Sequence, residues 1–279
     1  MKYVVLSAVL LVAPAAGARD ADDDWGESAG GFRALVGATW DSQYIWRGFD
    51  VFDGEDAVHV LADLNLFDTG FGVSVVGHQS PSEWLGALQR WDGTIYYQNG
   101  VFAGESYATN FRLGFVYYYY PKPNQGRTQD LMEGQVILSW PNLLPIPGLQ
   151  PSYAFAYMFP GRENRWAQTR NPDFDDNSTG MFHILMLDYA FTVPAVLRAL
   201  DDHVVKLHSE LVYNGGVSPY GTPVNSGLSH AVLGASTDLA LTAVPGLVLT
   251  PSFYYQFSFE DSVNPDNEFW ASISLKYVF

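Results

Sequence analysis

The sequence contains no cysteine and is poor in basic residues, with 14 Lys and Arg against 30 Asp and Glu and a formal net charge of −16. So acidic a chain disfavours nucleic acid and other anionic partners. Without disulfides, an exported chain needs another source of stability, such as complete pairing of its backbone. The six histidines show no HExxH or comparable metal spacing, and no phosphate-binding glycine loop occurs. We therefore expect no nucleic-acid partner, no metal site and no cofactor.

Long hydrophobic runs are also missing. The one apolar run, residues 3–12, follows Lys2 and precedes small residues at positions 16–18, which predicts a cleaved signal peptide over residues 1–18. A single membrane anchor is the alternative, but this run is too short to span a bilayer. Residues 19–30 are acidic and contain glycine, so we expect a flexible lead-in. Because no later stretch is apolar enough for a transmembrane helix, the exported chain is either soluble or a membrane β-barrel.

Aromatic residues and alternating strands are abundant instead. Aromatic side chains make up 15% of the chain, and from Phe269 to Phe279 every second residue is apolar. A period of two indicates a β-strand with one apolar and one polar face. This final segment resembles the closing strand of bacterial outer-membrane β-barrels, whose terminal aromatic residue is read by the barrel-assembly machinery. The resemblance implies that Phe279 is an assembly signal and that the protein is located in the outer membrane.

Twelve alternating segments can be counted after the lead-in. They cover residues 32–43, 57–66, 70–79, 90–98, 106–120, 129–140, 149–159, 179–191, 202–213, 228–242, 247–258 and 268–279. Compact turns alternate with longer loops that are richer in charge and turn residues. Short periplasmic turns, long extracellular loops and an even strand number are typical of outer-membrane barrels. Residues 31–279 are therefore predicted to form an all-β, antiparallel, up-and-down transmembrane barrel of about 12 strands.

The alternation also separates a lipid face from a lumen face. A charge on the lipid face near the middle of the bilayer costs roughly 2–4 kcal/mol, so charged strand residues are expected to point inward. They line water in an open pore, or pair with one another in a salt-bridge network that fills a narrow barrel. The candidates are Arg33, His59, Asp63, Asp92, Arg112, Glu133, Lys206, His208, Glu210, His230, Asp238 and Lys276.

One motif resembles a known family. Residues 40–48, WDSQYIWRG, are similar to the S-x-Y-x-[FW]-R-G signature near the start of the TorF-type porins. Residues 117–121 with Glu133 resemble that family's YYYYP…E segment, and residues 68–72 resemble its glycine turn. The resemblance covers residues 32–140 and implies passive transport without naming a solute.

Arg47 in this motif is predicted at the rim of the first outward loop, with Trp40, Tyr44 and Trp46 in the aromatic girdle. There it anchors lipid phosphates or packs the loop, or it reaches over the lumen and affects selectivity. We favour the anchoring or packing role.

The sequence thus predicts a porin-like channel for passive diffusion of small solutes or ions, with a mild preference for cations because of the acidic excess. Expected partners are outer-membrane lipid, lipopolysaccharide and the barrel-assembly machinery. A non-conducting structural or adhesion barrel, whose loop 160–178 binds an external ligand, is the alternative. A lipid-modifying enzyme is a further one, although we expect no enzyme: His208 and Ser209 are adjacent and so point to opposite faces of their strand.

Overall fold

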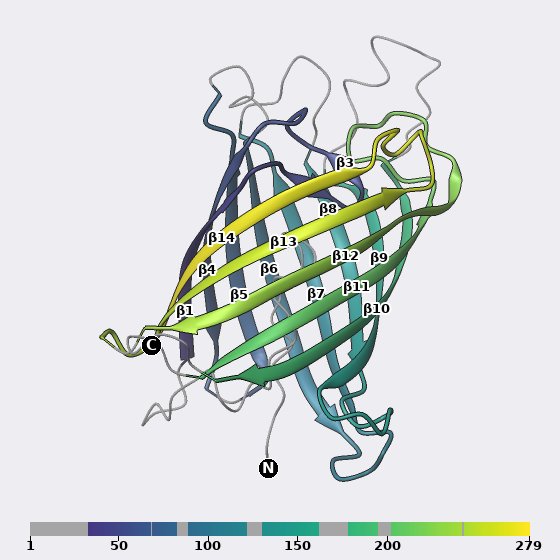
Figure 1. Ribbon diagram of the computed structural model, residues 1–279. Coiled ribbons are helices and arrows are strands. Elements are labelled where there is room, and N and C mark those ends of the chain that lie inside the picture. The colour runs from purple at the N-terminus through teal and green to yellow at the C-terminus, as the bar shows by residue number, and fades with distance from the viewer. Residues whose placement is uncertain are drawn as a thin grey trace.

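The computed structural model describes residues 33–67, 69–82, 89–121, 130–161, 178–194, 202–241 and 243–279. Twelve of its strands form one closed antiparallel barrel, in which each strand pairs with its neighbours in sequence and the last strand pairs with the first (Figure 1). The predicted fold class, an antiparallel barrel of about 12 strands, is confirmed. The predicted signal peptide at 1–18 and lead-in at 19–30 lie outside the described residues, as does most of loop 160–178.

The barrel strands match the predicted segments closely. They are β1 (Arg33–Asp41), β4 (Ala57–Asn65), β5 (Phe71–Gln79), β6 (Arg90–Val101), β7 (Thr109–Tyr119), β8 (Leu131–Ser139), β9 (Leu149–Pro160), β10 (Gly180–Val193), β11 (His203–Gly215), β12 (Ser226–Ala240), β13 (Leu247–Ser258) and β14 (Glu268–Val278). Two further strands, β2 (Ile45–Trp46) and β3 (Phe49–Asp50), form a separate hairpin that the sequence analysis did not foresee. In the described residues, no helix is long and apolar enough to cross a membrane.

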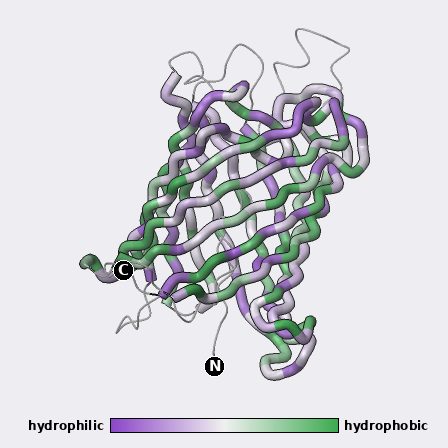
Figure 2. Tube along the Cα trace, in the orientation of Figure 1, coloured by the Kyte–Doolittle hydropathy of each residue, from purple (hydrophilic) through white to green (hydrophobic). Residues whose placement is uncertain are grey.

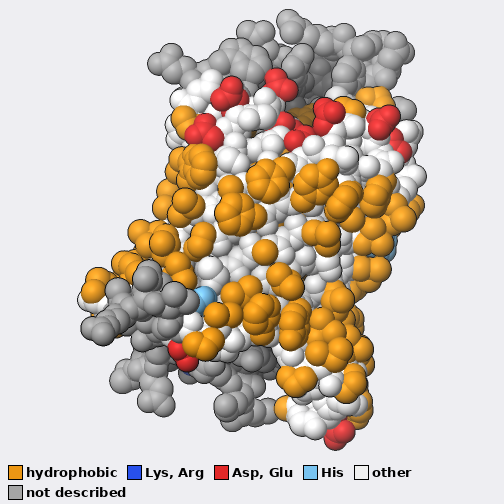
Figure 3. Space-filling model, in the orientation of Figure 1, with side chains coloured by type: hydrophobic (Ala, Val, Ile, Leu, Met, Phe, Trp, Pro, Cys, Tyr) orange, Lys and Arg blue, Asp and Glu red, His pale blue; other side chains and the backbone are white. Residues whose placement is uncertain are grey.

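The alternation along each strand turns apolar side chains outward and polar ones inward. Outward residues such as Ile95 and Phe253 are 61% and 57% exposed, whereas inward Arg112 is 1% exposed. Figure 2 shows the resulting change of hydropathy along neighbouring strands, and Figure 3 shows hydrophobic side chains spread over the outer wall. This is the reverse of a water-soluble fold, in which the large apolar side chains gather in the core.

The two ends of the barrel differ. The C-terminus and the compact turns lie at the lower end in Figure 1, and the longer connections lie at the upper end. The closing seam runs from Leu35 opposite Val278 to Asp41 opposite Ser272, and the backbone N–H of Phe279 donates to the Ala34 carbonyl at 2.9 Å. The last residue is thus tied to the first strand. A barrel closed in this way has no free edge, which explains how the chain does without disulfides.

Candidate functional site

The first long connection, residues 42–56, folds into the barrel. Within it, β2 and β3 pair Ile45 with Asp50 and Trp46 with Phe49, so that Arg47 and Gly48 form a two-residue hairpin turn. Both turn residues have positive φ, 52° for Arg47 and 91° for Gly48, as the favoured two-residue hairpin turns require. Trp46 is 2% exposed and Phe52, further along the loop, is fully buried. We call residues 42–56 the inserted loop.

Glycine is needed at the tip of this loop for a second reason. A Cβ atom at Gly48 would lie 2.5 Å from Nδ1 of His230, which is on β12. The Gly48 carbonyl in turn accepts a hydrogen bond from Nε2 of Gln256 on β13, at 3.0 Å. The backbone of the tip therefore contacts β12 and β13 directly, and only a residue without a side chain allows so close an approach.

Arg47 reaches the opposite side of the lumen. Its Nη2 lies 2.6 Å from Oε2 of Glu133 on β8, and its guanidinium lies 4.5 Å from the centre of the Phe182 ring on β10. These strands flank β9, which lies opposite β1 in the ring of strands. Burial disfavours the charged guanidinium, but the Glu133 carboxylate outweighs burial and holds the pKa of Arg47 above its usual value. Hydroxyl donation from Tyr118 to Glu133, at 3.2 Å, completes the contact.

The predicted anchoring of lipid phosphates by Arg47 is wrong, because its guanidinium is buried inside the barrel. Arg47 instead reaches over the lumen, which was the alternative, and its effect on selectivity stays a prediction. Tyr44 and Trp46, predicted in the girdle, are also buried in the lumen, at 1% and 2% exposure. Only Trp40 lies on the outer wall, where it is 40% exposed and its indole N–H donates to Asp56. The motif is a lumen hairpin, not an interface anchor.

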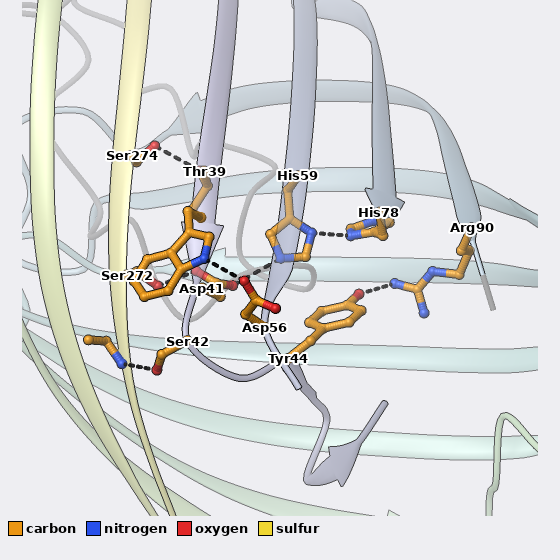
Figure 4. Close-up of polar contacts among 12 residues, drawn as sticks. Thr39, Asp41, Ser42, Tyr44, Asp56, His59, His78, Arg90, Ser272 and Ser274 are labelled. Carbon is orange, nitrogen blue, oxygen red and sulfur yellow. Dashed lines mark hydrogen bonds and ion pairs between the residues drawn. The ribbon is translucent and has the colours of Figure 1, made fainter. Parts of the chain in front are cut away.

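A row of ionisable side chains lies beside the start of the inserted loop (Figure 4). Nδ1 of His59 and Nδ1 of His78 are 2.7 Å apart, and Nε2 of His59 faces Asp41 at 3.0 Å. Nε2 of His78 faces Asp92 at 3.1 Å. Asp92 also pairs with Arg90, whose Nε lies 2.8 Å from its Oδ1. These residues come from β1, β4, β5 and β6, which are consecutive around the barrel.

Tyr44 covers this row from the inserted loop. Its ring stacks on His78 with centroids 5.2 Å apart and meets His59 edge-on at 4.7 Å. Its hydroxyl accepts a hydrogen bond from Nη2 of Arg90 at 2.7 Å. The inserted loop is thus held at both ends of its path, by Tyr44 at the start and by Arg47 at the tip.

Nearer the lower end, the lumen charges also pair. Tyr96 donates to Asp63 at 2.8 Å, and the Arg112 guanidinium lies 3.5 Å from the centre of the Tyr96 ring. Across the lumen, Nζ of Lys206 lies 2.6 Å from Asp238, which also accepts a hydrogen bond from Thr250. These pairs lie on the walls of the lumen and leave opposite charges facing one another, as in the salt-bridge alternative.

A second histidine cluster lies on β10, β11 and β12. Nδ1 of His208 is 2.7 Å from Asp188, and its Nε2 is 3.6 Å from Glu210. Nε2 of His230 approaches the same Glu210 at 3.7 Å, while its Nδ1 is 2.9 Å from the hydroxyl of Ser229. The register between β11 and β12 shifts here, since Val212 pairs with His230 and Tyr213 pairs with Leu228. Ser229 and His230 are both buried, although neighbours in a regular strand point to opposite faces.

The structure places all twelve predicted lumen residues on the inward face of their strands. Arg33 shares the face of Asp41 on β1, and Lys276 shares that of Ser272 on β14. The other ten are His59, Asp63, Asp92, Arg112, Glu133, Lys206, His208, Glu210, His230 and Asp238. Their role in a pore stays a prediction, because most of them are engaged with partners inside the barrel.

Sequence reasoning missed other inward residues. Asp41, His78, Arg90 and Asp188 follow the same alternation and could have been found from it, the first three at strand ends and Asp188 within β10. The apolar part of the inner wall on β7 to β11 carried no such signal, because apolar residues there stand on both faces. It comprises Val116, Ile137, Ala154, Ala156, Met158, Phe182, Ile184, Met186 and Val212.

No family model matches the sequence, and no curated protein is similar to it. The TorF resemblance therefore stays a prediction. Solved structures with a similar course of the chain include a KdgM porin, with a TM-score of 0.48, 10% identity and coverage of 88% of this chain and 99% of that one. LpxR from Salmonella typhimurium has a TM-score of 0.48, 8% identity and coverage of 88% and 100%. The COG4313 outer membrane channel from Pseudomonas putida F1 has a TM-score of 0.48, 9% identity and coverage of 94% and 100%.

Proposed function

We propose that this protein is an outer-membrane channel for passive diffusion of small solutes or ions, held closed in the present state by the inserted loop. The observation that carries the proposal is the reversed barrel, with large apolar side chains outside and ionisable side chains and the inserted loop inside. A lipid-facing wall explains the first property, and a path for polar solutes explains the second.

Aromatic side chains at both ends of the outer wall support a membrane location. Trp40, Trp91 and Tyr119 stand near the upper strand ends, and Phe71 and Phe191 near the lower ones, all between 37% and 56% exposed. Barrels place aromatic rings at both membrane interfaces, where the ring contacts lipid and a polar tip contacts water. Acidic side chains gather above this apolar wall, at the upper end in Figure 3. An acidic outer surface of this kind suits lipopolysaccharide bridged by divalent cations.

The mechanism requires the inserted loop to move. Arg47, Phe52 and Trp46 are buried in the upper lumen, where Arg47 contacts β8 and β10 and Trp46 contacts Tyr118 on β7. The Arg47–Glu133 pair and the Tyr44 contact together hold the loop across the path, so losing either one favours the open state in which a solute passes. Below the loop, small hydroxyl side chains such as Ser139, Ser236 and Ser274 line the inward face.

We propose a preference for cations because of the acidic side chains at the upper rim of the barrel. Residues 50–56 contain four acidic side chains, residues 259–267 contain three, and neither segment contains Lys or Arg. In the lower lumen, by contrast, acidic groups are matched by Lys206, Arg112 and Lys276. Unbalanced negative charge at the entrance concentrates cations there before they reach the constriction.

One observation favours the second candidate, a non-conducting barrel. Lumen side chains at the level of the inserted loop, such as Glu133 and His230, are 0% and 1% exposed. If the inserted loop never releases, the barrel is a closed scaffold for its outer loops. We propose no enzymatic role, since Ser209 bonds the backbone on the outer side of β11 while His208 faces inward.

Conductance of the chain without residues 1–18, refolded and inserted into a planar bilayer, tests the proposal. Discrete current steps and a reversal potential of cationic sign in a salt gradient are expected. A variant lacking residues 44–52, joined by a short glycine linker, is expected to give larger and longer-lived steps. If heat-modifiable, folded protein gives no steps in either form, the channel proposal fails and the closed scaffold replaces it.

A further inference from the structure

The contact between His59 and His78 fixes how many protons the two rings carry. A distance of 2.7 Å between two ring nitrogens is a hydrogen bond, so one Nδ1 carries a proton and the other accepts it. Each Nε2 faces a carboxylate oxygen, Asp41 at 3.0 Å and Asp92 at 3.1 Å. A carboxylate only accepts, so each Nε2 carries a proton as well. The four ring nitrogens therefore hold three protons, one more than two neutral imidazoles.

Both carboxylates are placed to be ionised. Asp41 accepts a further hydrogen bond from the Ser272 hydroxyl. Asp92 accepts one from Nη2 of Arg90 at 3.0 Å, and Nε of the same guanidinium forms an ion-pair contact with its Oδ1 at 2.8 Å. Hydrogen bonds and a neighbouring cation favour the charged form of a carboxyl group. Protonating either carboxyl would replace its contact with a weaker neutral one.

The charges of the row agree with this proton count. Asp41 and Asp92 contribute two negative charges, and Arg90 contributes one positive charge. One extra proton on the histidine pair makes the sum zero. Among the described residues, the other titratable groups that interact with the row add no net charge. They are the neutral tyrosines 44, 118, 120, 220 and 254 and the Arg47–Glu133 pair, whose two charges cancel. Because His59, His78, Asp92 and Arg90 are each 4% exposed or less, any other proton count would leave an uncompensated buried charge.

We infer that His59 and His78 form a proton-binding site that shares one extra proton, and that this proton locks the inserted loop in the lumen through Tyr44. The inference deepens the proposed function by naming its regulation. The Tyr44 ring stacks on His78 with an interplanar angle of 6°, and a ring face attracts a cation, so the positive pair holds the loop.

Both directions of titration release the lock. Removing one proton from the two rings leaves a buried net negative charge. It also leaves one ring nitrogen with a lone pair that faces either a carboxylate or the lone pair of the other ring's Nδ1. Adding another puts an N–H on each Nδ1 at a separation of 2.7 Å, which forces the rings apart. Since Tyr44 lies on both rings, at 4.7 Å and 5.2 Å between centroids, either movement displaces it. The loop is therefore held within a window of pH and freed on both sides.

A proton fits this contact better than a metal ion. Two imidazole nitrogens on one tetrahedral zinc ion lie about 3.3 Å apart, given bond lengths of about 2.0–2.1 Å. The observed separation is 2.7 Å, and the described part of the chain holds no group of three or more His, Cys, Asp or Glu suited to a metal.

The proton count can be read directly by NMR on the refolded protein with ¹⁵N-labelled histidine. For two of the six histidines, we expect both Nε2 atoms protonated and a scalar coupling between the two Nδ1 atoms across one shared proton. His59→Gln should abolish this coupling. Finding the two rings with one proton each, in the window where Tyr44 is docked, would overturn the inference. This readout does not involve conduction, so it stands or fails independently of the channel proposal.

The lock itself can be tested with a single cysteine, because the chain has none of its own. Phe49 of the inserted loop is 4% exposed, so Phe49→Cys should react slowly with a membrane-impermeant thiol reagent while the loop is docked. We expect the labelling rate to pass through a minimum and to rise about tenfold per pH unit on either side, as expected for release linked to one proton. A rate that does not change with pH, in protein that stays folded, contradicts the lock.

Matched histidine variants locate the effect. In the Phe49→Cys background, His78→Asn places an amide near the former Nδ1 and removes titration, so the minimum should flatten. His183→Asn, on the outer wall beside Tyr153, and His208→Gln, in the second lumen cluster, should keep it. If instead His208→Gln flattens the curve while His78→Asn leaves it unchanged, the proton lies in the second cluster and the inference is wrong.

Discussion

Arg47 and Glu133 form a buried ion pair across the lumen, 2.6 Å apart, between the tip of the inserted loop and the wall opposite β1. They are 86 residues apart in the sequence. Because Glu133 has no exposed surface and the Arg47 side chain is 2% exposed, neither charge has water as an alternative partner. Removing one partner of a buried pair costs roughly 3–5 kcal/mol, whereas replacing both by apolar residues is often neutral. The docked state of the loop therefore depends on keeping both charges or neither.

Glu133→Gln is expected to release the inserted loop, because the Arg47 guanidinium then stays buried without a counter-charge. Open probability in single-channel recordings should rise by at least about tenfold, the equivalent of 1.4 kcal/mol. The double variant Arg47→Met with Glu133→Met should restore docking. Glu260→Gln, at the exposed rim, serves as the control and should leave gating unchanged. Equal open probabilities in the single and double variants would show that the pair does not hold the loop.

Gly48→Ala is expected to lift the hairpin tip from the wall. Alanine at a φ of 91° is strained by roughly 1–2 kcal/mol, and its Cβ would also lie 2.5 Å from Nδ1 of His230. Gly54→Ala is the matched control: Gly54 has a φ of 81°, but a Cβ there meets nothing within 4 Å. Both variants share the backbone strain and only one has the clash. Thiol labelling of a Phe49→Cys reporter should therefore become faster in Gly48→Ala than in Gly54→Ala. Equal labelling rates in the two variants would show that backbone strain alone causes the effect.

The strands were predictable from the sequence because alternation is a local property. Segment 57–66 became β4 (Ala57–Asn65), and segment 247–258 became β13 with the same bounds. The inserted loop was not predictable in the same way, since β2 and β3 have only two residues each and their contacts lie on distant strands. The neighbours Trp46 and Arg47 give no periodic signal, and the partner of Arg47 on β8 is set by barrel closure.

The residues of the candidate site were likewise only partly predictable from the sequence. Inward charges such as Asp63 and Lys206 follow from the cost of a charge in lipid. The apolar inner wall does not, because inward Ile184 and Met186 alternate with outward Leu185 and Leu187, and both faces look alike. The pairing of His59 with His78 was equally hidden, since it needs the register that places them opposite each other on β4 and β5.

Neutralising the acidic rim is expected to reduce the preference for cations. In Glu260→Gln with Asp261→Asn and Asp266→Asn, the reversal potential in a salt gradient should move toward zero. Single-channel amplitude in high salt should change little, because the rim is outside the constriction and salt screens it. An unchanged reversal potential would mean that selectivity is set inside the lumen.

The same rim charge gives a prediction for pH. Hydrogen bonds from the side chain and backbone N–H of Ser262, and from Asn225, lower the pKa of the exposed Glu260 carboxyl. A lowered pKa keeps this group charged to a lower pH than an ordinary glutamate, and its charge is lost as the pH falls through that lowered value. Cation preference contributed by Glu260 should therefore persist in mild acid. Ser262→Ala removes the hydroxyl donor and should move the loss toward neutral pH in recordings made at a series of pH values; an unmoved curve would exclude this role.

Phe279 is predicted to act in assembly more than in stability. Its ring is 58% exposed and touches Tyr277, while the seam between β1 and β14 extends from Asp41 to Val278 without it. Deleting Phe279 should therefore leave refolding into detergent micelles almost unchanged, as measured by heat-modifiable mobility. In cells, the amount of folded protein in the outer-membrane fraction should fall several-fold, because the assembly machinery no longer finds the terminal aromatic residue. Phe279→Tyr keeps an aromatic end and should assemble normally. A deletion that fails equally in detergent and in cells would instead assign Phe279 to closure of the barrel, through its backbone bond to Ala34.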